Sequence, residues 1–112
     1  MNKEFWEKLD TLVLESEIVV ERPKGSAHPR YPEYIYPHDY GCLNNTTSSD
    51  GCEIDCWQGS LSEVKVTGIV VTVDLEKRDS EIKVLIGCSD SDMSDIEKVH
   101  NRGQLSGVLI KR

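Results

Sequence analysis

Apolar residues near the N-terminus recur at the spacing of one helix face. These apolar positions are Phe5, Trp6, Leu9, Leu12 and Val13, with charged residues between them. Residues three and four apart lie on the same side of a helix, so the pattern predicts a helix over residues 2–16, with Asn2 as its N-cap. We expect the apolar face of this helix to pack on a sheet.

The rest of the chain carries strand patterns and one further helix. Runs rich in β-branched residues predict strands over residues 17–21, 52–57, 64–75, 81–87 and 107–111, with a bend at Gly68 in the longest run. Residues 89–102 predict a helix with a capping box from Ser94 to Glu97 and Gly103 after its end. Strands of antiparallel character flanked by helices favour a mainly β, α+β fold, namely a small five-stranded OB-like barrel. At 112 residues we expect one domain, 1–112, with the barrel over about residues 17–112.

A long irregular stretch over residues 22–47 interrupts this regular pattern. All four prolines lie within it, and so do the four tyrosines, at positions 31, 34, 36 and 40. Long irregular segments inside a compact domain are uncommon and are usually functional or disordered. Tyrosine rings normally dock on the protein, which argues for order. The stretch is therefore predicted to be an ordered surface that carries a site.

The composition and net charge of the chain limit which partners and which cellular compartment we expect. The chain has 13 Lys and Arg against 20 Asp and Glu, a net charge of −7, which argues against nucleic-acid binding. A phosphate ligand would therefore need a local basic pocket or a divalent metal. No apolar run resembles a signal peptide or reaches membrane-spanning length, so a cytoplasmic protein without a membrane partner is expected. The four cysteines are then expected to be reduced, free thiols.

Carboxylates follow the irregular stretch at short spacing. Asp50 precedes Gly51, and Asp55 lies within the predicted strand over residues 52–57. Two carboxylates converging where a loop enters a strand suit Mg²⁺, which takes one or two carboxylates and keeps water in its other positions. In the alternative interpretation, Asp50 caps the turn and Asp55 is merely exposed.

Further charged residues surround the predicted hairpin between residues 64–75 and 81–87. Asp74 ends the apolar run, and Asp79, Glu81 and Lys83 alternate so that they share one face of the returning strand. Such a stripe is either a solvated edge or a source of a metal ligand and a phosphate-binding ammonium.

Together these segments resemble the soluble, magnesium-dependent inorganic pyrophosphatases. The resemblance is carried by the run from Glu21 to Ser26, by Tyr36-Pro37-x-x-Tyr40-Gly41, and by Asp50-Gly51-x-x-x-Asp55. It continues thinly through Gly68 and Asp74 to Lys83. The resemblance implies a five-stranded OB-like barrel that hydrolyses diphosphate to two phosphates with Mg²⁺ as cofactor.

The resemblance also implies roles for individual residues. The implied catalytic residues are Tyr40, Asp55 and Lys83, with Tyr40 beside the attacking water. The implied substrate-binding residues are Lys24, Arg30, Tyr36 and Lys83. The implied metal ligands are Asp50, Asp55 and Asp74, together with Asp79 or Glu81, and Glu21 is implied as a partner of metal-bound water.

Three departures from the family pattern bear on activity. Cys52 stands where the signature has a central aspartate, which in the family helps to deprotonate the attacking water. The phosphate-binding arginine has no counterpart other than Arg30, and nothing in Leu105 to Arg112 replaces the family's C-terminal Tyr-Lys pair.

Two functions therefore stay open. The first is a Mg²⁺-dependent hydrolase of diphosphate, impaired by Cys52. The second is a non-catalytic OB-like module that binds Mg²⁺ and a small phosphorylated ligand. Either function implies a small phosphate-containing partner. A homo-oligomer remains open as well. His38 is expected either at the surface or against the substrate.

Overall fold

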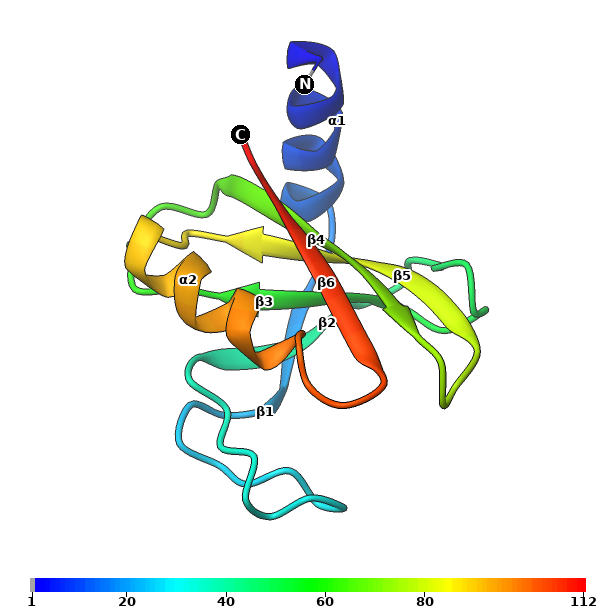
Figure 1. Ribbon diagram of the computed structural model, residues 1–112. Coiled ribbons are helices and arrows are strands. Elements are labelled where there is room, and N and C mark those ends of the chain that lie inside the picture. The colour runs from blue at the N-terminus through cyan, green and yellow to red at the C-terminus, as the bar shows by residue number, and fades with distance from the viewer. Residues whose placement is uncertain (1) are drawn as a thin grey trace.

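The computed structural model describes residues 2–112, which form two helices and six strands. In chain order, the elements are α1 (Lys3–Leu14), β1 (Ile18–Arg22), β2 (Asp39–Leu43), β3 (Ile54–Gln58), β4 (Val66–Asp74), β5 (Asp79–Ile86), α2 (Asp90–Val99) and β6 (Leu105–Lys111). The mainly β, α+β class is thus as expected. Figure 1 shows the β1–β2 connection projecting at the end of the molecule opposite α1.

The six strands form one mixed sheet in the order β1-β2-β3-β5-β4-β6. Neighbouring strands are antiparallel except for β3 and β5, which run parallel. Within residues 2–112, the outer strands β1 and β6 each pair with a single neighbour, so the sheet does not close on itself. The prediction of a five-stranded barrel is therefore wrong in both strand number and closure.

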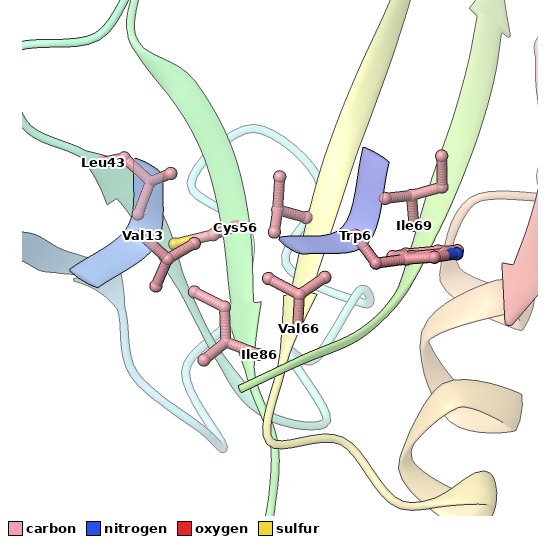
Figure 2. Packing of buried hydrophobic residues seen from close by; sticks show 8 residues of the cluster. Trp6, Val13, Leu43, Cys56, Val66, Ile69 and Ile86 are labelled. Carbon is pink, nitrogen blue, oxygen red and sulfur yellow. The ribbon is translucent and has the colours of Figure 1, made fainter. Parts of the chain in front are cut away.

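Helices on both faces explain why the sheet stays open. On one face, Trp6 and Val13 of α1 pack against Leu43, Cys56 and Ile69 of three strands (Figure 2). On the other face, Met93 and Ile96 of α2 pack against the strand residues Trp57, Val70 and Leu85. Alternate residues of the central strands are thus buried on opposite sides. Each face has its own helix cover, and the strands need not curl around a single core.

Strand β2 lies within the stretch over residues 22–47 that the sequence predicts to be irregular, so that prediction is wrong for residues 39–43. Here Gly41 is required by strand pairing, because a Cβ at position 41 would lie 1.8 Å from the carbonyl oxygen of Val19 on β1. Only a residue without a side chain allows the two backbones to approach so closely. On its other side, β2 pairs with β3, and this places Tyr40 opposite Trp57.

The capping residues of the two helices agree only in part with those that the sequence predicts. Asn2 caps α1 as predicted, since its side chain accepts a hydrogen bond from the backbone N–H of Glu4. The capping box of α2 lies at Ser89 and Asp92, not at Ser94 and Glu97, because Asp92 reaches back to the N-cap as a glutamate would. No helix within residues 2–112 is long and apolar enough to cross a membrane.

Asp92 also joins α2 to the end of β3. Its Oδ2 accepts hydrogen bonds from the backbone N–H and hydroxyl of Ser60, both at 2.7 Å, and from the backbone N–H of Ser89 at 2.9 Å. His38 lies 3.5 Å from Oδ1. Burial alone would raise the pKa of Asp92, but these donors outweigh it and lower the pKa from 3.8 to about 2.

This depressed pKa predicts a pH-dependent contribution to stability. Because the folded-state pKa lies below the unfolded value, the contribution is present above pH ~4 and is lost as the pH falls through ~2, and amounts to about 2 kcal/mol. In urea unfolding, the advantage of the wild type over Asp92→Asn should shrink by about this amount between pH 6 and pH 2. The control is Asp90→Asn, at an exposed position in the same helical turn. An advantage of the same size at both pH values would contradict the assignment.

Candidate functional site

The centre of the candidate site is the ammonium group of Lys83, on the face of β5 that α2 covers. Its Nζ donates to Asp55 Oδ2 at 2.5 Å, to Glu81 Oε2 at 2.7 Å and to the Tyr40 hydroxyl at 3.1 Å. Strand geometry explains the arrangement. Glu81 and Lys83 share a face of β5, while Asp55 and Tyr40 come from β3 and β2. The structure therefore brings together all three residues that the resemblance implies as catalytic.

The electrostatics of this cluster are those of a partly desolvated ion pair network. Burial works to lower the pKa of Lys83, but its anionic neighbours outweigh burial and raise the pKa above its usual value. Burial raises the pKa of Tyr40 and of Glu81. A hydrogen bond between the carboxyl groups of Glu81 and Asp50 lowers the pKa of Asp50. Asp50 itself is exposed.

The cluster opens into a pocket of about 530 Å³. Tyr40, Glu81 and Lys83 line one part of it, and Trp57 and Thr72 also contribute. The rest of the wall comes from the β1–β2 connection, the β4–β5 turn and the segment between α2 and β6. The volume lies within the usual range for small-molecule sites, roughly 300–1,000 Å³.

Four more of the candidate residues line this pocket away from Lys83. Asp74 and Asp79 flank the β4–β5 turn, where Asp74 Oδ1 accepts the backbone N–H groups of Glu76 and Lys77. Arg30 reaches across from the β1–β2 connection to Glu76, at 3.8 Å, with 73% of its side chain exposed. The ring of Tyr36, also in the β1–β2 connection, packs against the ring of Tyr40, with the two ring centroids 5.6 Å apart. All four residues thus line the pocket, and the two aspartates do so at the β4–β5 turn.

The remaining candidates lie outside the pocket lining. Lys24 is exposed, and its backbone N–H donates to Asp39 Oδ1 at 2.8 Å. Glu21 is exposed on β1. Cys52 is exposed and precedes β3, which begins at Ile54, so the prediction of a strand from residue 52 is wrong. The cause is Asp50, whose carboxylate accepts the backbone N–H of Cys52 at 2.9 Å and closes a turn there.

The side chains of this cluster are chemically suited to bind a hard divalent cation. Asp50, Asp55 and Glu81 offer carboxylate oxygens, the ligands that Mg²⁺ prefers. Among residues 2–112, however, no three acidic, histidine or cysteine side chains are arranged to hold a metal ion. The ammonium group of Lys83 lies between Asp55 and Glu81 and forms an ion pair with each of them. A cation at these carboxylates would therefore compete with Lys83.

Two histidines lie where sequence reasoning did not place them. His38 is buried, 3.3 Å from Asp95, and is neither at the surface nor in the pocket lining. His100 lines the pocket, and burial lowers its pKa to about 4. Its Nε2 accepts the indole N–H of Trp57 at 3.0 Å, so the neutral ring carries its proton on Nδ1. No periodicity marks His100, because its role depends on a contact with a residue 43 positions away.

The cysteines are free thiols, as expected. Cys42, Cys56 and Cys88 are buried, and Cys52 is exposed. Burial raises the pKa of each buried thiol to about 12, and Glu53 adds to the effect at Cys42. The buried thiols are thus protonated at neutral pH and are poor metal ligands or nucleophiles.

Comparison with known proteins gives a likeness of fold. No family model matches the sequence, and no curated protein matches it. Among solved structures, the chain is similar to an inorganic pyrophosphatase from Neisseria gonorrhoeae, with a TM-score of 0.59 and 22% sequence identity. The similarity covers 80% of this chain and 77% of the other. The chain therefore has a pyrophosphatase-like fold.

Proposed function

We propose that the pocket binds a small phosphorylated ligand of the diphosphate type together with Mg²⁺, and that the chain hydrolyses diphosphate slowly. The observation that carries this proposal is the cluster of Lys83, Asp55, Glu81 and Tyr40 in the pocket region of a pyrophosphatase-like fold. Such a cluster pairs a cation for phosphate oxygens with carboxylates for a hard metal. The free cysteines support a reducing compartment, which we take to be the cytoplasm.

The chain's own residues divide into two roles in this proposal. Lys83 donates to a phosphate oxygen in place of a carboxylate, and Arg30 supplies a second cation at the pocket mouth. Asp50, Asp55 and Glu81 are the residues that would hold Mg²⁺. A bound Mg²⁺ lowers the pKa of coordinated water and neutralises phosphate charge. Tyr40 adds a hydroxyl donor beside Lys83.

Slow hydrolysis is proposed because the chain lacks one carboxylate of the family signature. Cys52 stands in that place, and its side chain is exposed beside Asp50. A positioned acid–base group contributes about 10²–10⁴-fold to a rate, so its loss is costly. The alternative is binding without any catalysis. One observation favours it: Lys83 forms ion pairs with Asp55 and Glu81, so a catalytic metal would have to compete with Lys83 for these carboxylates.

Calorimetric titration with diphosphate, with and without Mg²⁺, tests the binding proposal. We expect saturable binding with Mg²⁺ and at least about tenfold weaker binding when EDTA removes the metal. Inorganic phosphate is the matched control and should bind more weakly than diphosphate. A parallel phosphate-release assay separates the two functions: measurable release supports the hydrolase, and binding without release supports the non-catalytic module. Absence of diphosphate binding in either condition would refute both.

A further inference from the structure

We propose that the ligand is a nucleotide, in which the phosphate chain is joined to a planar heteroaromatic ring that docks on the tyrosine-rich part of the pocket. This inference rests on the proposed function, because it names the class of phosphorylated ligand that the same pocket takes. The inference is supported by the aromatic side chains of the β1–β2 connection, which would have no role if the pocket bound phosphate groups alone.

A continuous series of rings leads from the loop to Lys83, and we call these rings the aromatic wall. Its members are His28, Tyr31, Tyr34, Tyr36, Tyr40 and Trp57, all of which line the pocket. Successive centroids are close: 5.5 Å for Tyr31–Tyr34, 6.2 Å for His28–Tyr36 and 5.6 Å for Tyr36–Tyr40. At its inner end, the Tyr40 hydroxyl accepts a hydrogen bond from Lys83 Nζ at 3.1 Å. One ligand can therefore reach both the rings and the ammonium.

The loop that carries four of these rings, all except Tyr40 and Trp57, is held by its own hydrogen bonds. Tyr36 and Ser26 pair through the backbone at 2.9 Å, as do His28 and Tyr34 at 2.8 Å. The ring nitrogen Nδ1 of His28 accepts the backbone N–H groups of Arg30 and Tyr31, each at 3.1 Å. Burial, with nearby cations, lowers the pKa of His28, which keeps this ring nitrogen free to accept. The rings are thus presented in a fixed arrangement, which lowers the entropic cost of docking a planar group.

Guanidinium groups add a second feature of base-stacking sites. The Arg102 guanidinium carbon lies 4.4 Å from the centroid of Tyr34, and that of Arg30 lies 5.5 Å from the centroid of Tyr31. Both arginines line the pocket. Aromatic rings and arginine planes are the groups on which nucleobases stack in proteins. The same arginines supply positive charge for phosphate oxygens.

Bare diphosphate matches this pocket poorly. It is a dense anion without apolar surface, so it would use the Lys83 end and gain nothing from the aromatic wall. The pocket lining contains as many carboxylates as cationic side chains, four of each, so it has no net positive charge to hold a free polyanion. The carboxylates are those of Asp74, Glu76, Asp79 and Glu81. A ligand with a flat ring buries apolar surface on the wall and directs its charge to Lys83.

The ligand is a mononucleotide and not a nucleic-acid strand. The net charge of −7 opposes a long polyanion, whose affinity depends on neutralising many phosphates. Arg30 and Arg102, whose guanidinium groups lie over rings of the wall, both line this one pocket. A short single-stranded oligonucleotide therefore serves as a competing probe in the test.

Calorimetric titration at constant Mg²⁺ with adenosine 5′-diphosphate, inorganic diphosphate and a five-nucleotide strand tests the inference. We expect the nucleotide to bind about tenfold more tightly than diphosphate, since this factor lies within the range that stacking on one ring contributes. Tyr34→Leu should remove this advantage, whereas Tyr34→Phe, which keeps the ring, should retain it. Both variants should bind diphosphate as the wild type does. Phe5→Leu removes a ring on the distant helix α1 and should change nothing.

The outcomes separate this inference from the function on which it rests. If diphosphate binds as tightly as the nucleotide, or if Tyr34→Leu keeps the tenfold advantage, the nucleotide assignment is wrong while the diphosphate site stands. If neither ligand binds, the proposed function fails as well. Tighter binding of the strand than of the nucleotide would overturn the mononucleotide assignment. Circular dichroism checks folding, and Tyr31→Leu gives the same test at a second position of the wall.

Discussion

Replacing Lys83 with methionine is expected to lower the free energy of unfolding by about 3 kcal/mol and to weaken diphosphate binding by at least about tenfold. Methionine keeps the packing of the lysine stem but removes the ammonium. Asp55 and Glu81 then lose their shared cation, and only 27% and 9% of their side chains are exposed. A largely buried pair of carboxylates without a partner cation is strongly unfavourable. Urea unfolding at pH 7 measures the effect on stability.

The matched control is the same substitution at Lys111. That lysine pairs with Asp90 at 3.1 Å, but both side chains are more than half exposed, and exposed pairs contribute little. Lys111→Met should therefore unfold like the wild type and bind diphosphate normally. The double variant Lys83→Met/Asp55→Asn should recover part of the lost stability, because it removes one uncompensated charge. Equal unfolding free energies for the two lysine variants would refute the buried network.

Changing Cys52 to aspartate is expected to raise the rate of Mg²⁺-dependent diphosphate hydrolysis by about 10²-fold or more. The substitution restores the carboxylate that the family signature has two positions after Asp50. The position is exposed and directly follows a turn closed through a backbone N–H, so the added carboxylate meets no packing cost. Steady-state phosphate release at pH 7 measures the change.

Cys52→Ser is the control for this prediction, because a hydroxyl removes the thiol without adding a carboxylate. It should hydrolyse diphosphate as slowly as the wild type. Equal rates for the aspartate and serine variants would show that the missing carboxylate does not limit catalysis. A wild-type turnover of about 100 per second, typical of efficient enzymes, would contradict the impairment itself.

Periodicity predicted most of the elements but not how they assemble. The helix face that contains Trp6 and Val13 packs on the sheet as expected, and the irregularity near Gly68 is present in the β4–β5 register. Strand β2 was missed because Gly41 is needed for close backbone approach, which a single sequence cannot distinguish from a turn. Closure was mispredicted because it depends on which strands pair at the edges.

The sequence allows the proximity of site residues to be predicted where those residues lie on the same strand. Alternation placed Glu81 and Lys83 together, and the signature placed Tyr40 and Asp55 near them. The spacing could not indicate that Lys83 would itself lie between Asp55 and Glu81. Nor could it indicate His100, which enters the pocket wall through a hydrogen bond to Trp57. Contacts between distant segments decide these features.

Mapping diphosphate binding on the folded chain tests the central claim most directly. In a ¹H–¹⁵N NMR titration with Mg²⁺ present, the largest shifts are expected at the backbone amides of Tyr40, Asp55, Glu81 and Lys83, where the cluster adjoins the pocket. The amide of Lys111, at a surface ion pair on β6, should not move. Shifts confined to surface lysines such as Lys111, or no shifts at saturating diphosphate, would contradict a phosphate site at Lys83.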